Sequence, residues 1–276
     1  RSTPTCGNSF VAVEAERASA KDICWHYVVS KEVASELEAL DVYPQRIYVL
    51  EGSPARSRFY RQQLLELEKK IQPDVVFSVF GPAFVKFSSP HLMGMGNGWV
   101  THSTWLAFKS LGGAKAILKQ LAGAVYKGYW ARQADRWVVE ADNSRIGMIE
   151  RLHLPPSAIA VVPNSCAALF GDANVADAVF PNTDEPVRLL YLAAWYGHKN
   201  IQSIPSVARE LKRIAPERKI EFVITVPKDE PSLEYFNADV DRFGVRDYID
   251  NRGRVSLADA LDLYASVDAC FMPSLL

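Results

Sequence analysis

A histidine, a lysine and an asparagine stand together directly after an apolar run, in the stretch VRLLYLAAWYGHKNIQSI at positions 187–204. His198 and Lys199 can carry positive charge, and Asn200 is a residue type that often caps helices. Ligands of open parallel sheets bind beyond the carboxyl ends of the strands, where free N–H groups at helix starts favour anions. The stretch therefore predicts a phosphate site. From spacing alone, a solvated lysine beside a helix cap is an equally good interpretation.

The elements that must position this stretch alternate between short β-rich runs and segments of helical periodicity, which is typical of parallel α/β folds. In the first part of the chain, strands are predicted at 25–30, 46–51, 74–80 and 136–140, and a helix at 57–71. In the second part, strands are predicted at 187–193, 219–227, 248–253 and 268–273, and helices at 201–214, 232–243 and 257–267. The pattern predicts two doubly wound lobes in series.

A polar stretch with weak periodicity, GDANVADAVFPNTDEP, divides the two sets of elements and indicates a linker. We expect an N-terminal Rossmann-like domain over 1–170, the linker over 171–186 and a partial C-terminal domain over 187–276. The chain begins without methionine and ends just after the apolar run ACFMP. The sequence therefore predicts a fragment of a longer protein.

Composition limits the classes of function. The chain has 276 residues, of which 49% are hydrophobic, and a formal net charge of -1. This size supports a full core, and the charge gives no global field that would attract nucleic acid. Four cysteines without C-x-x-C spacing indicate reduced thiols of a cytoplasmic protein rather than a metal ribbon or redox pair. No apolar run approaches the roughly 20 residues of a membrane span.

Four segments resemble, in order and spacing, the family-4-type retaining glycosyltransferases (glycosyl transferases group 1) of the GT-B fold. These segments are DVVFSVFGPAF (74–84), the stretch from ADRWVV to its VVPN exit (134–167), LLYLAAWYGHKNIQSI (189–204) and NRGRVSLADALDLYASVDACFMPSLL (251–276). The resemblance covers most of the chain, strongly in the second lobe and weakly in the first. It implies two Rossmann-like lobes facing a central cleft, incomplete here at both ends, with the second lobe binding a nucleotide sugar.

The resemblance implies a diphosphate site around the GHKN turn. Lys199, with His198 and Asn200 beside it, would hold the donor diphosphate. Gly7, in CGNSF, stands where the family has a glycine-rich loop close to the same phosphates. Many relatives carry an arginine five residues before the lysine, and here that position is Ala194, so His198 is a candidate to compensate for the missing cation.

The resemblance also implies contacts with the remainder of the donor. Arg254 and Val255 lie in a loop whose backbone contacts the base in the family, while Ser274 and Leu275 begin the loop beside the sugar and phosphate. Gly81 corresponds to a glycine-bearing strand end of the first domain. His102, in WVTHSTW, is the candidate for the histidine that touches the donor sugar near the reaction centre, and an ordinary loop histidine is its alternative. The family's paired glutamates, seven residues apart, would follow beyond the last residue given.

The function implied is that of a metal-independent, retaining hexosyltransferase without a cofactor. It would move a sugar from a nucleotide-sugar donor to a saccharide or lipid-linked acceptor in the biosynthesis of cell-surface polysaccharide or glycan. Asp239 and Asp241 form a D-x-D pair of the kind that binds metal in another glycosyltransferase fold, but their amphipathic helical context favours a solvated face, so no metal is predicted. A nucleotide-sugar epimerase of the same fold and a non-catalytic nucleotide-binding fragment remain as alternatives.

A basic window lies in the first part of the chain. Positions 75–134 hold no acidic residue, and their cations include Lys86, Lys109, Lys115, Lys119, Lys127 and Arg132. Residues 105–133 mix apolar, aromatic and basic side chains at roughly helical spacing, which predicts an amphipathic helix on an anionic membrane surface. The protein would then be cytoplasmic and peripheral on the inner membrane face. An ordinary packed helix with solvated lysines has equal support, and the four glycines within 105–133 weaken a long helix.

Overall fold

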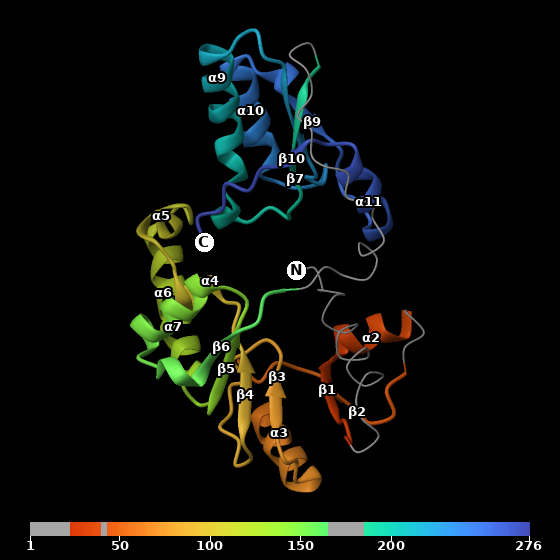
Figure 1. The fold of residues 1–276 in the computed structure, drawn as a ribbon, viewed down its shortest axis with the longest axis vertical. Coiled ribbons are helices and arrows are strands. Elements are labelled where there is room, and N and C mark those ends of the chain that lie inside the picture. The colour runs from red at the N-terminus through yellow and green to blue at the C-terminus, as the bar shows by residue number, and fades with distance from the viewer. Residues whose placement is uncertain (1–22, 40–42, 165–184) are drawn as a thin grey trace. The chain divides into compact units, whose positions relative to one another are not determined.

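The computed structural model describes residues 23–39, 43–164 and 185–276, and its chain forms two compact units (Figure 1). Unit 1 comprises residues 1–102 and 122–167, and unit 2 comprises residues 103–121 and 168–276. Residues 103–121 therefore pack with the unit that contains the second set of strands, although they lie within the first set in the sequence. Each unit is built from helices and parallel strands, which confirms the predicted α/β class.

Unit 1 contains two parallel sheets. In the smaller sheet β1 (Tyr27–Ser30) pairs with β2 (Ile47–Leu50). The larger sheet has the order β3 (Val76–Ser78), β4 (His91–Gly94), β5 (Arg136–Val139) and β6 (Ile159–Val161). The helices and turns that lie wholly in unit 1 are α2 (Lys31–Ala39), α3 (Arg58–Ile71), α4 (Gly98–Thr101), α7 (Asp142–Leu152) and η1 (Pro156–Ala158). All the strands predicted in the first part of the chain are confirmed, and β4 and β6 were missed.

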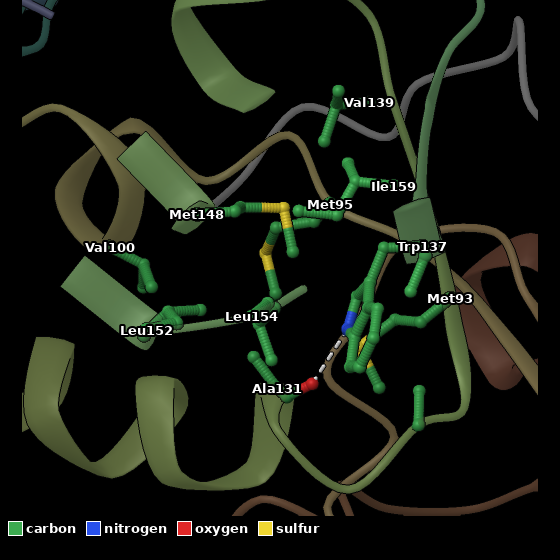
Figure 2. Close-up of a cluster of buried hydrophobic side chains, with 12 residues drawn as sticks. Met93, Met95, Val100, Ala131, Trp137, Val139, Met148, Leu152, Leu154 and Ile159 are labelled. Carbon is green, nitrogen blue, oxygen red and sulfur yellow. Dashed lines mark hydrogen bonds between the residues drawn. The ribbon is translucent and has the colours of Figure 1, made fainter. Parts of the chain in front are cut away.

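The core of unit 1 packs around Trp137 and a group of methionines (Figure 2). The Trp137 indole N–H donates a 2.8 Å hydrogen bond to the carbonyl of Ala131, so the one polar atom of this large side chain is satisfied where it is buried. On Gly147 of α7, a Cβ would collide with the backbone of Thr101 in α4. The absence of a side chain there lets the two helices approach closely and fixes α4 beside the sheet.

Unit 2 contains one parallel sheet, with the strand order β10-β7-β8-β9. Its strands are β7 (Val187–Tyr191), β8 (Ile220–Ile224), β9 (Ile249–Asn251) and β10 (Ala269–Cys270). Its helices and turns are α5 (Trp105–Lys109), η2 (Gly197–Lys199), η3 (Ile201–Ser203), α9 (Ile204–Ile214), α10 (Leu233–Phe243), η4 (Arg246–Tyr248) and α11 (Leu257–Ala265). Helices α9 and α10 lie side by side and bury Ile204, Phe236 and Val240 against the sheet residues Tyr191 and Phe222 (Figure 1). Each strand and helix predicted in this part of the chain is confirmed.

The basic window forms two helices rather than one. Helix α5 ends at Lys109, and α6 (Ala114–Ala131), which contributes residues to both units, begins after a turn. The turn contains Gly112 with φ +76, a left-handed conformation that glycine adopts without the penalty of a Cβ. A continuous helix across 105–133 is therefore wrong, although 18 residues of that range form the single helix α6. Within the described parts of the chain, no helix is both long enough and apolar enough to cross a bilayer.

Candidate functional site

The carboxyl ends of β7 and β10 mark the point where the strand order of unit 2 reverses. From β7 the chain proceeds to β8 and β9 on one side, and then returns to place β10 on the other side of β7. Connections that leave two such neighbouring strands run in opposite directions, which opens a crevice beyond the carboxyl ends. Residues 192–200 leave β7 and residues 271–276 leave β10 at this crevice. The sheet topology alone therefore identifies the place for a ligand.

The segment that leaves β7 forms two short 3-10 turns before α9 begins. The Lys199 N–H donates to the Tyr196 carbonyl at 2.9 Å, and the Asn200 N–H donates to the Gly197 carbonyl at 3.2 Å. Asn200 has φ 58 and makes no side-chain cap hydrogen bond. It reverses the chain through a left-handed conformation, which its short polar side chain tolerates. The expected cap role of Asn200 is thus wrong, and Lys199 precedes α9 by the whole η3 turn.

Lys199 is half-buried in this turn. Among the described residues, no carboxylate lies within ion-pair distance of its ammonium. A cation that is partly removed from water and has no counter-charge is costly to hold, and an anionic ligand would offset that cost. The site therefore suits a phosphate electrostatically.

The neighbouring imidazole contributes no charge at neutral pH. The pKa of His198 is lowered from its ordinary value, first by partial burial and second by the charge of Lys199. The Tyr196 ring stacks on the imidazole, with ring centroids 5.6 Å apart. The lowered pKa favours a neutral, hydrogen-bonding His198 in the free protein, and its compensation for the arginine absent at Ala194 stays a prediction.

The main chain of His198 joins the two segments of the crevice. Its carbonyl accepts a hydrogen bond from the Leu275 N–H at 2.8 Å and another from the Ser274 hydroxyl at 3.3 Å. The structure thus brings together four of the residues predicted for the donor site, namely His198, Lys199, Ser274 and Leu275. Their contacts with a donor stay predictions.

Helix α5 packs against the same turn, which the sequence did not indicate. The Thr104 hydroxyl accepts from the Ala107 N–H at 3.2 Å, which caps α5, and it lies 3.5 Å from the Leu275 carbonyl. A Cβ on Gly197 would lie 3.0 Å from the Ser110 carbonyl. Gly197 therefore permits a close approach of α5 to η2. Only the glycine was visible in the sequence, and it gave no indication of its neighbour.

The predicted base loop lies farther along the same edge of the sheet. The Asn251 side-chain oxygen accepts from the N–H groups of Val226 and Gly253, at 3.1 and 3.0 Å, which ties the exits of β8 and β9 together. Arg254 is exposed and Val255 is half-buried in the following turn. Since β9 is separated from β7 by one strand, this loop lies about 10 Å from the crevice, at roughly 4.8 Å per strand. That spacing suits an extended ligand rather than a small anion.

In unit 1, His102 and Gly81 follow the carboxyl ends of β4 and β3. His102 Nδ1 lies 2.8 Å from the Thr101 hydroxyl, and burial, followed by the charge of Arg151, lowers the pKa of the imidazole. At neutral pH this ring is uncharged. The Gly81 N–H donates to the Gly94 carbonyl at 2.7 Å, and a Cβ on Gly81 would collide with the Met93 side chain. Gly81 is thus required for close packing beyond β3, whatever ligand binds there.

Three remaining predictions concern Gly7 as a phosphate contact, the D-x-D pair of α10 and metal binding. Gly7 lies outside the described residues. Asp239 pairs with Arg242 and Asp241 pairs with Arg246, each at 2.7 Å on the exposed face of α10, so the solvated interpretation of the D-x-D pair is supported. Within the described ranges, no group of three His, Cys, Asp or Glu residues could hold a metal ion.

No protein-family model matches this sequence, and no curated protein matches it either. Solved structures do resemble its fold. A glycosyltransferase from Rickettsia africae ESF-5 aligns over 90% of this chain with a TM-score of 0.57 and 14% identity, and this chain spans 65% of its length. WaaG, a glycosyltransferase involved in lipopolysaccharide biosynthesis, aligns over 99% of this chain and 72% of its own, with a TM-score of 0.56 and 12% identity. Anabaena HepE, solved with UDP and glucose, aligns over 98% and 71%, with a TM-score of 0.55 and 12% identity. The likeness shows that the lobes belong to the GT-B fold.

Proposed function

We propose that the protein is a glycosyltransferase that transfers a hexosyl group from a nucleotide sugar to a saccharide or lipid-linked acceptor. The observation that carries this proposal is the half-buried Lys199, which lies where the strand order reverses, in a turn in which the His198 carbonyl also accepts a hydrogen bond from the segment that leaves β10. A diphosphate supplies the counter-charge that the described residues do not. The GT-B fold favours a nucleotide sugar over other phosphate compounds, and HepE was solved with UDP and glucose.

The chain's own groups can perform the proposed step at the donor. As the glycosidic bond breaks, negative charge grows on the leaving diphosphate, and a positioned cation stabilises that charge more in the transition state than in the ground state. We assign this role to Lys199, so the proposed reaction needs no metal. We assign the sugar contact to His102, whose Nδ1 lies beside the Thr101 hydroxyl and whose neutral ring can hydrogen-bond an uncharged sugar. Retention of configuration is part of the proposal because of the family-4-type resemblance.

Helix α6 supports the finer proposal of an acceptor at a membrane. Leu118, Val125 and Tyr129 are exposed by 69%, 74% and 56%, and their spacing places them on one face of the helix. Three lysines of this helix, hereafter the α6 lysines, are Lys115, Lys119 and Lys127. An apolar face accompanied by cations suits the anionic surface of the inner membrane, where each nearby cation contributes about 1 kcal/mol. We propose that the protein is cytoplasmic and docks there through this face, within reach of a lipid-linked acceptor.

A nucleotide-sugar epimerase is the second candidate. The fold also matches a putative UDP-N-acetylglucosamine 2-epimerase from Listeria monocytogenes, with a TM-score of 0.52 and 13% identity over 99% of this chain and 72% of its own. An epimerase would use the same phosphate site but release an altered sugar nucleotide without an acceptor. A non-catalytic nucleotide-binding module would bind the donor without turnover.

Product analysis separates the three candidates. The purified protein is incubated with UDP-, GDP- and ADP-hexoses, with and without a mixture of saccharide and lipid-linked acceptors, and the products are identified by mass spectrometry. Nucleoside diphosphate that is released only with acceptor supports the transferase, whereas an epimerised sugar nucleotide formed from donor alone supports the epimerase. Donor binding is measured in parallel on Lys199→Ala and on Lys219→Ala, an exposed lysine at the opposite end of the sheet. If no nucleotide sugar binds to the unaltered protein, all three candidates fail.

A further inference from the structure

A cysteine, a histidine and a tyrosine meet at the amino ends of β1 and β2. Cys24 Sγ lies 3.4 Å from His26 Nε2, and His26 Nδ1 lies 3.2 Å from the Tyr48 hydroxyl. The imidazole and phenol rings are stacked, with centroids 5.9 Å apart and an interplanar angle of 10°. The Cys24 thiol is free and exposed. The three side chains thus form a cluster that solvent can reach and that the proposed glycosyl transfer does not use.

The order of the contacts is that of a nucleophile, a base and a group that orients the base. The thiolate is the form of cysteine that attacks electrophiles. If the Cys24 proton moves to His26 Nε2, the imidazolium donates Nε2–H to the sulfur and Nδ1–H to the Tyr48 oxygen. Both N–H groups of the charged ring then have acceptors in the observed geometry, so the transfer requires no reorientation of the ring. The ring stack holds the imidazole in this position.

A second free thiol provides a comparison within the same chain. Cys270 in β10 is also free and exposed. Among the described residues, no histidine lies within hydrogen-bond distance of its sulfur. The two thiols therefore share exposure and differ in the presence of a base. Any difference in their reactivity tests the contribution of the imidazole.

We propose that Cys24 is a thiol-modification site that reacts with disulfides of the glutathione type, with His26 as its base and Tyr48 as a positioning residue. The Cys24 sulfur attacks one sulfur of the disulfide, a new S–S bond forms and the original S–S bond breaks. The proton passes from Cys24 to His26 Nε2 and then to the leaving thiolate. The products are a mixed disulfide on Cys24 and one reduced thiol, so atoms and electrons balance without any other reactant.

This site is separate from the proposed donor site and does not depend on it. The amino ends of parallel strands lie at the edge of a sheet opposite the carboxyl-end loops, and Cys24 and His26 precede β1. A modifier the size of glutathione at this edge adds bulk and charge to unit 1. The inference therefore stands or falls independently of sugar transfer.

The test compares the two thiols in one sample. The protein is exposed to oxidised glutathione between pH 6 and 8, and peptide mass spectrometry follows the mixed disulfide on Cys24 and on Cys270 separately. An unassisted thiol is only a few per cent thiolate at pH 7, and an adjacent base raises the rate by accepting the thiol proton as the sulfur attacks. We expect Cys24 to react at least about ten times faster than Cys270 at pH 7.

Two variants assign the effect to the cluster. His26→Gln should reduce the Cys24 rate to that of Cys270, while Tyr48→Phe, which keeps the ring stack and removes the oxygen, should give an intermediate rate. Equal rates for the two cysteines of the unaltered protein would overturn the proposal, and this comparison needs no variant to fold. An unchanged Cys24 rate in a folded His26→Gln protein would show that the imidazole is not the base of this reaction.

Discussion

Replacing Lys199 with alanine is the sharpest test of the proposed donor site. A hydrogen bond to a charged group is worth about 1.5 to 3 kcal/mol, and each 1.36 kcal/mol changes a rate tenfold. Lys199 is half-buried, the lowered pKa of His198 favours a neutral imidazole beside it and position 194 is an alanine, so the loss should approach the upper end of this range. We expect kcat/KM for sugar transfer to fall by at least about a hundredfold.

The loss should divide unequally between kcat and KM. Because charge on the diphosphate grows as the glycosidic bond breaks, kcat should fall more than KM rises. Lys199→Arg should restore only part of the activity, since the guanidinium is broader and its charge is spread over more atoms. Initial rates of nucleoside diphosphate release, measured at saturating acceptor over a range of donor concentrations, give both parameters.

Two controls isolate the role of the ammonium. The His198 carbonyl, rather than its ring, holds the exit of β10, so His198→Ala preserves that contact and removes only a neutral imidazole. A neutral hydrogen bond of about 0.5 to 1.5 kcal/mol corresponds to a loss of roughly two- to tenfold. Lys219→Ala should leave the kinetics unchanged. Near-normal kcat/KM in Lys199→Ala would refute the phosphate role and leave the solvated-lysine interpretation.

Three further outcomes are expected. Gly147→Ala places a methyl group against the Thr101 backbone and should lower the free energy of unfolding by about 1 to 3 kcal/mol. The control Gly123→Ala, whose methyl group would meet no atom within 4 Å, should be neutral or stabilising. Thermal melts compare the two variants, and equal melting temperatures would contradict the packing argument. The pKa of His91, only 2% exposed, is lowered by burial, so the unfolded chain takes up its proton more readily and stability should decline as the pH falls below about 6.5. Urea midpoints measure this decline, which a His91→Gln variant should show less steeply; the same slope in both proteins would assign it to other groups. Changing the α6 lysines to glutamate should abolish sedimentation with anionic vesicles and leave the circular dichroism spectrum unchanged, and persistent binding would remove the membrane proposal.

The strands that the sequence predicted well are largely apolar runs between polar turns. Val187–Tyr191 and Ile220–Ile224 form the two central strands of their sheet, and they are apolar except for Arg188 and Glu221, which pair with each other at 3.3 Å. One of the two missed strands, His91–Gly94, contains no β-branched residue and ends in glycine, so its composition gives no strand signal. It exists because it pairs on both sides, with β3 and β5, which is a tertiary effect.

The site was predictable only in part, for the same reason. That a cation follows a buried strand is visible in the sequence, and so is the phosphate chemistry that this placement permits. The hydrogen bonds from Ser274 and Leu275 to the His198 carbonyl join segments that are 76 residues and more apart, and no local pattern encodes them. The approach of α5 to η2 could not be predicted either, because a glycine in a sequence does not indicate which neighbouring segment its missing side chain allows to approach.

The two halves of the predicted site do not have equal physical support. In unit 2, strand topology selects the crevice beyond β7 and β10 without reference to any residue type, and the half-buried lysine is found in that crevice by a separate route, its position after a buried strand. In unit 1, the described strands of the larger sheet follow one another in the order β3-β4-β5-β6, so within that part of the chain no reversal of order singles out the loops that hold Gly81 and His102. The assignment of His102 therefore depends on resemblance and on its neutral imidazole, whereas the assignment of Lys199 would stand if the resemblance were set aside.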